Sequence, residues 1–180
     1  MIRAALHAAI DRFGRHYDYD ATYMHEILDT SRAAFLKLLL AQGMNQHHDA
    51  VPAAALFAAR IAAVRHEDCG PCAQLTLNMA REAGVASATL KAIVTGARAE
   101  LPAEVALAQA FAEAVLAHAP ADELRERVRA LWGERGLVTL AYAISATRIY
   151  PTMKRVLGHA QACELLAVDG EQLVAAGQAS

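Results

Sequence analysis

The feature that most restricts the fold of this 180-residue chain is the helical spacing of its apolar residues. Ile2, Leu6, Ile10 and Phe13 recur at steps of three and four residues, as on one face of a helix. The same spacing predicts further helices over 21–42, 52–67, 71–84 and in several segments between 87 and 150. No series of alternating β-branched and aromatic runs joined by Asn-Gly or Asp-Gly turns is found. We therefore predict an all-α fold, a single domain of about seven to eight helices.

Composition and charge indicate the environment of the chain. The formal net charge is −2 and no long basic run occurs, which argues against a nucleic-acid partner. Charged residues interrupt the amphipathic N-terminus, so it is not a secretory signal, and the longest apolar run, 136–146, is too short to cross a bilayer. Three cysteines with one close pair suit a reducing compartment. We expect a cytoplasmic protein with no membrane partner.

The most informative motif is the CGPC of "HEDCGPCAQ", residues 66–74. Gly70 and Pro71 can form a turn in which Pro71 begins a helix, so both sulfurs lie near a helix N-terminus. The partial positive charge there favours thiolate, and two cysteines at this spacing can close a small disulfide. Thioredoxin-type chemistry requires a strand before the motif, and none is predicted before Cys69. The motif therefore indicates dithiol chemistry on a helical scaffold.

Two other interpretations of Cys69 and Cys72 stay open. The pair can be structural, with inert thiols. A zinc site would need two more ligands, for which His66, His159 and Cys163 are the candidates, without a second closely spaced ligand pair among them. We expect no metal and no other cofactor, and we interpret Cys163 as a small core residue.

A family resemblance adds to these observations. The stretch from about Ala50 to Gly158 contains an alanine-rich segment running into CxxC, then "LKAIVTGARAELPAEVALAQAFAEAV" and "WGERGLVTLAYAISATRIYPTMKRVLG". It resembles the carboxymuconolactone decarboxylase and alkyl hydroperoxidase D-like superfamily. The resemblance implies an all-helical homo-oligomer and divides the domain 1–180 into N-terminal helices (1–49), the family core (50–158) and a C-terminal helix and tail (159–180).

The resemblance also implies roles for the two cysteines. In redox members the second cysteine attacks peroxide and the first resolves the sulfenic acid, which makes Cys72 peroxidatic and Cys69 resolving here. The local sequence alone does not choose between the two sulfurs. The family pattern also has a Glu about twelve residues before the first cysteine and a His four after the second. Phe57 and Thr76 occupy those positions, so the usual proton relay is missing.

Several residues could take over parts of that relay. His66 and Glu67 directly precede the motif, and His25 and His159 belong to other predicted helices. Thr76 cannot act as a base near neutral pH, although its hydroxyl could donate to a Cys72 thiolate. Arg148 and Tyr150 fall near a family stretch that lines the site, and a buried ion pair or helix-end cap is an equally good interpretation of them.

We therefore predict a thiol-dependent oxidoreductase, a weak hydroperoxide reductase that cycles Cys69 and Cys72 between dithiol and disulfide. Its expected partners are a second copy of the chain, a peroxide or other small substrate, and a protein electron donor. One alternative is a helical oligomer that binds a small ligand, with a structural cysteine pair. Another is a small-molecule enzyme like the carboxymuconolactone decarboxylases.

Overall fold

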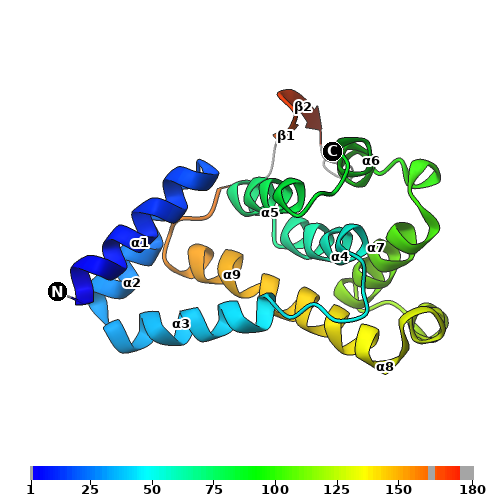
Figure 1. Cartoon of the computed structure of the whole chain (residues 1–180), viewed down its shortest axis with the longest axis horizontal. Coiled ribbons are helices and arrows are strands. Elements are labelled where there is room, and N and C mark those ends of the chain that lie inside the picture. The colour runs from blue at the N-terminus through cyan, green and yellow to red at the C-terminus, as the bar shows by residue number, and fades with distance from the viewer. Residues whose placement is uncertain (1, 162–164, 175–180) are drawn as a thin grey trace.

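The alanine-rich helix α4 (Ala53–His66) lies at the centre of the computed structural model, which describes residues 2–161 and 165–174. It contacts α5 (Gly70–Glu82), α6 (Ser87–Thr95), α7 (Ala103–Leu116) and α8 (Asp122–Thr147). A 3-10 turn, η1 (Arg98–Glu100), connects α6 to α7. Alanines 55, 58, 59 and 63 are fully buried on different sides of α4. Their small side chains let the neighbouring helices surround α4 closely (Figure 1).

A second core lies under the N-terminal helices. It is formed by α1 (Ile2–Tyr17), α2 (Thr22–Thr30), α3 (Arg32–Asn45) and α9 (Ile149–Val156). Its buried members include Ile10, Tyr23, Leu28 and Phe35. Because α3 contacts α8, and α9 directly follows α8, this unit is joined to the rest of the helical domain (Figure 1). The predicted all-α fold is confirmed.

The single helix predicted over 21–42 is wrong, because the chain breaks at Ser31. Ser31 is extended, with φ −158° and ψ 108°, and its hydroxyl accepts a hydrogen bond from the Ala34 N–H at 3.2 Å. Serine is a favoured N-cap because its oxygen satisfies a free N–H of the first turn. Helix α3 then continues through Gly43 to Asn45, although a glycine often ends a helix.

Helix α8 is the longest helix and changes direction at Gly133. That residue has φ 67° and ψ −171°, a backbone conformation that only glycine adopts easily. Helix α8 ends before Arg148, and Pro151 lies in the first turn of α9, where its missing N–H costs no helical hydrogen bond. None of the helices in the described ranges is both long and apolar enough to cross a bilayer.

The C-terminal segment contains a β-hairpin where a helix followed by a tail was expected, and the helix is wrong for 165–168. Strands β1 (Leu165–Val168) and β2 (Glu171–Val174) pair antiparallel, with Leu166 opposite Leu173. Asp169 and Gly170 between them have φ of 53° and 79°, and positive φ at both central residues is typical of a tight hairpin turn. Cys163, predicted as a core residue, lies outside the described residues.

Candidate functional site: a buried cysteine pair beside a small cavity

The two cysteines lie at the start of α5, where the sequence predicted them. Cys69 is the N-cap, with φ −121° and ψ 93°, and Gly70 and Pro71 are the first two helical residues. Proline fits this position because the first N–H groups of a helix have no partner within the helix. The turn brings the Cα atoms of Cys69 and Cys72 to 5.3 Å from each other, and the two sulfurs form a disulfide.

Both cysteines are buried, Cys69 at 1% exposure and Cys72 at 4%. Part of this cover comes from the C-terminal segment. The Gly70 N–H donates to the Gln161 carbonyl at 3.1 Å. One turn further along α5, the Gln74 side chain binds the β1 backbone twice: its Nε2 donates to the Ala167 carbonyl at 3.0 Å, and its Oε1 accepts from the Ala167 N–H at 2.8 Å. These bonds hold the hairpin against the helix that carries the cysteines.

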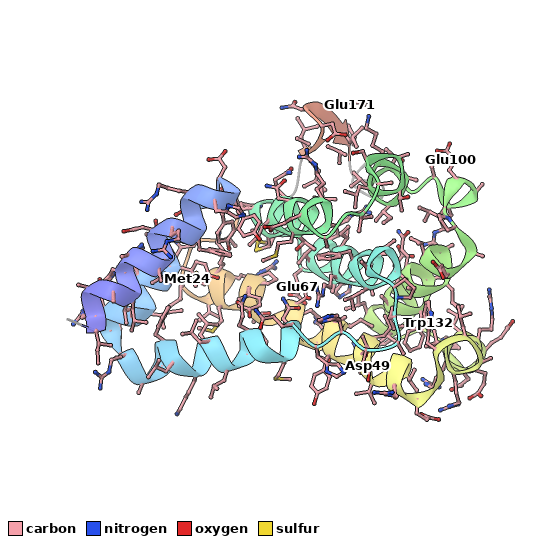
Figure 2. The ribbon with its side chains drawn as sticks, viewed as in Figure 1. Met24, Asp49, Glu67, Glu100, Trp132 and Glu171 are labelled. Carbon is pink, nitrogen blue, oxygen red and sulfur yellow. A yellow bond between two sulfur atoms is a disulfide. The ribbon has the colours of Figure 1, made fainter. Side chains whose placement is uncertain are left out.

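Cys72 lines a cavity of about 50 Å³, and Cys69 is not among the residues that line it. The wall combines aromatic, thioether and amide side chains from the N-terminal helices with residues of α5, α8 and α9. Met24, labelled in Figure 2, contributes from α2. The cavity therefore borders one cysteine of the pair, and it distinguishes two cysteines that the local sequence left equivalent.

Tyrosine hydroxyls and amides supply much of the polarity of this cavity. Burial raises the pKa of Tyr19 and of Tyr150 to about 12, and it raises the pKa of Tyr23 further. The Tyr150 hydroxyl donates to Gln42 Oε1 at 3.4 Å, and Asn45 also lines the wall. Because these phenols stay protonated at neutral pH, they can donate hydrogen bonds to a ligand but cannot take a proton from a thiol.

Two of the predicted site residues, Thr76 and Tyr150, line the cavity with Cys72. The Thr76 hydroxyl donates to the backbone carbonyl of Cys72 at 2.8 Å, one turn below it. A hydroxyl has one proton to donate, so in this oxidised form Thr76 does not donate to the Cys72 sulfur, in contrast to the bond we expected with a thiolate.

Glu67 and Arg148 form a pair with each other. Arg148 Nε donates to Glu67 Oε1 at 2.5 Å, and the Glu67 side chain is only 14% exposed. Arg155 donates to the Glu67 backbone carbonyl. For Arg148 this is the ion pair that we gave as an alternative to lining the site. Neither Glu67, labelled in Figure 2, nor Arg148 lines the cavity of Cys72.

None of the four candidate bases lines the cavity. His66 is exposed at the end of α4. His25 contacts Asp11 at 3.1 Å, and His159 contacts Glu26 at 2.8 Å. Across the described residues, the wall of the cavity contains no imidazole and no carboxylate. The structure therefore offers no direct replacement for the proton relay that Phe57 and Thr76 lack.

Sequence reasoning missed the polar residues that come to the cavity from the N-terminal helices, namely Tyr19, Tyr23, Gln42 and Asn45. The helical spacing predicts Tyr23 to be a core residue, and Gln42 is only the last residue of the predicted helix 21–42. Tyr19 lies in the polar "YDYD" segment, 17–20, and no motif connects that segment to the cysteines. Only the folded chain shows that these residues face Cys72.

The described residues contain no group of three or more His, Cys, Asp or Glu side chains that could hold a metal ion. Comparisons of the chain with family models, with curated proteins and with solved structures find no match. The site is thus defined by its own geometry, as a buried CxxC disulfide whose second cysteine lines a small cavity in an all-α domain.

Proposed function

We propose that this protein is a thiol-dependent oxidoreductase in which Cys69 and Cys72 alternate between dithiol and disulfide, with a small hydroperoxide as the oxidant. The observation that carries the proposal is that Cys72 is bonded to Cys69 and also lines a cavity. A substrate in that cavity would meet the Cys72 sulfur first. This agrees with the roles that the family resemblance implies for the two cysteines.

The reaction proceeds in three balanced steps. The reduced Cys72 sulfur attacks the peroxide O–O bond, giving a Cys72 sulfenic acid and an alcohol that carries the former thiol proton. The Cys69 thiol then attacks the sulfenic sulfur, which forms the disulfide and releases water. An external dithiol reduces the disulfide and is itself oxidised. The first turn of α5 favours the Cys72 thiolate, and the cavity hydroxyls can donate hydrogen bonds to the leaving oxygen.

The test uses reduced protein mixed with hydrogen peroxide or tert-butyl hydroperoxide, with thiols and sulfenic acid followed over time. We expect wild type to form the disulfide, and Cys69→Ser to stop at a sulfenic acid that dimedone traps. Cys72→Ser should lose the reaction, whereas Cys163→Ser, the matched control, should keep it. Oxidation of Cys72 no faster than that of a free thiol, or unchanged peroxide turnover in Cys72→Ser, would refute the proposal.

A second candidate, a ligand-binding protein with a structural disulfide, is favoured by the absence of any imidazole or carboxylate from the described wall of the cavity. It predicts that Cys69→Ser/Cys72→Ser keeps ligand affinity and loses only stability. It also predicts that the reduced wild-type thiols resist peroxide as strongly as other buried thiols. The dimedone experiment separates the two candidates directly.

We further propose that the protein acts in the cytoplasm as a homo-oligomer, with a protein dithiol as electron donor. Apolar side chains exposed on α3 support the oligomer, because monomers seldom expose several large apolar residues on one helix face. The cytoplasm fits a disulfide that must be reduced again after each turnover.

A further inference from the structure

A second and larger cavity, of about 540 Å³, adjoins the cavity of Cys72. Gln42, Asn45 and Met79 line both cavities and so form their common boundary. Val51, Leu56 and Phe57 give the larger cavity an apolar side. Its volume lies in the range that small organic ligands occupy in proteins.

Arg60 of α4 also lines the larger cavity, and its charge is poorly compensated. One Nη2–H donates to the Asn45 backbone carbonyl, and the guanidinium carbon lies 5.0 Å from the centre of the Phe57 ring. The Nε atom is buried and has no hydrogen-bond partner among the described residues. No carboxylate in the described part of the chain forms an ion pair with Arg60.

The surroundings of Arg60 make an anion favourable there. Burial lowers the pKa of its guanidinium, because a charge removed from water loses solvation. The carboxylate of Glu82 lines the same cavity but is already bound to Tyr17, whose hydroxyl donates to it, and to His16 at 3.3 Å. A half-buried cation without an acidic partner is costly, and an anion bound beside the guanidinium in the cavity would relieve that cost.

We propose that the larger cavity binds the carboxylate of a small amphipathic organic acid, with Arg60 as the anion-binding residue and the apolar side against the hydrocarbon part. A guanidinium suits a carboxylate because its N–H groups match the two oxygens. A phosphate dianion would need further cationic or N–H donors. The proposal concerns a site apart from the sulfurs, so it does not depend on turnover of the disulfide.

The test is calorimetric titration with hexanoate, with uncharged hexanamide of the same shape, and with inorganic phosphate. We expect hexanoate to bind and both other probes to bind at least about tenfold more weakly. Arg60→Gln should weaken hexanoate about tenfold, which corresponds to about 1.4 kcal/mol. The matched control, Arg127→Gln, removes the same charge from an exposed position on α8 and should leave affinity unchanged.

Three results would overturn the proposal: no hexanoate binding, equal affinity for hexanamide, or binding that Arg60→Gln leaves unchanged. Phosphate binding as tight as hexanoate would show a general oxyanion site instead. If Arg60→Gln does not fold, the wild-type protein decides the question by nitrogen NMR. Hexanoate should then shift the Arg60 Nε–H resonance, and hexanamide should not; an unmoved resonance counts against the site.

Discussion

Four tyrosines hold their phenol protons more tightly than free tyrosine does, and three of them line the cavity of Cys72. The pKa of Tyr17 rises to about 12 through burial and through the hydrogen bond to Glu82. Burial raises the pKa of Tyr19, Tyr23 and Tyr150. A ligand in the cavity therefore meets hydroxyl donors over the whole neutral pH range.

The same tyrosines should make the protein sensitive to alkali. Unfolded tyrosines ionise near pH 10, whereas the folded ones stay protonated until about pH 12. The folded state then binds more protons, so the free energy of unfolding falls as pH rises through this window. Urea unfolding should show a loss of at least about 1 kcal/mol between pH 10.5 and 11.5. Tyr23→Phe should reduce the loss, and an unchanged loss in that variant would contradict this explanation.

The Glu67–Arg148 pair should contribute to stability because the carboxylate is mostly buried. Glu67→Gln keeps the shape of the side chain but removes its charge. We expect the free energy of unfolding to fall by about 1–2 kcal/mol, less than the usual value for a hydrogen bond to a charged group because the Arg148 side chain is 43% exposed. Glu134→Gln at the exposed pair with Arg129 is the control and should cost less than about 0.5 kcal/mol. Equal losses in both variants would mean that burial does not strengthen the Glu67 pair.

At the scale of single elements, the bend in α8 depends on one glycine. Gly133→Ala should lower the free energy of unfolding by about 1–3 kcal/mol, because its φ of 67° with ψ of −171° strains any residue with a Cβ atom. Gly43 in α3 is helical and has no atom within 4 Å of an added Cβ. Gly43→Ala should therefore stabilise the protein by about 0.5–1 kcal/mol in the same denaturant experiment. The prediction requires that Gly133→Ala lower the free energy of unfolding and that Gly43→Ala raise it.

The elements that sequence reasoning predicted well are those with strong local signals. The helix after Pro71 ends before Gly84, which has φ 82°, as a C-terminal glycine predicts. The break at Ser31 was missed because the apolar spacing continues across it, although a serine N-cap was available as a signal. The hairpin was missed because one short Asp-Gly turn was outweighed by the helical pattern of the remaining chain.

For the candidate site, the sequence predicted the cysteine pair but not the residues that surround it. CGPC at a helix start is a local pattern, and the pair lies where that pattern indicates. The partners of the site come from distant segments, since Tyr23 and Gln42 reach Cys72 only through packing of α2 and α3 against α9 and α5. One sequence contains no information on such distances unless a motif connects the segments.

At the scale of the whole molecule, α3 runs along one edge of the domain (Figure 1), and it carries exposed apolar side chains. They form an apolar stripe of Leu36, Leu40 and Met44, which lie four residues apart and so on one face, and Leu40 is 74% exposed. We expect this stripe to be the contact between copies of the chain. Leu40→Glu should give a monomer in sedimentation velocity at micromolar concentration, with an unchanged circular dichroism spectrum.

Leu131→Glu is the control for this experiment, because Leu131 is also exposed but lies at the other end of the molecule, on α8 before Gly133. It should leave the oligomer intact. A wild-type monomer would remove the basis of the prediction, and an oligomer that survives Leu40→Glu would place the contact on another surface.

The groups that cover Cys69 and Cys72 limit how fast an external dithiol can reduce the disulfide. An external dithiol must reach a sulfur atom before any exchange can begin, and both sulfurs lie beneath other groups of the fold. A protein reductant must therefore wait until the start of α5 or the hairpin opens. A redox titration of this protein therefore reports an equilibrium only after incubation longer than that opening time. Shorter incubations would record how often the fold opens.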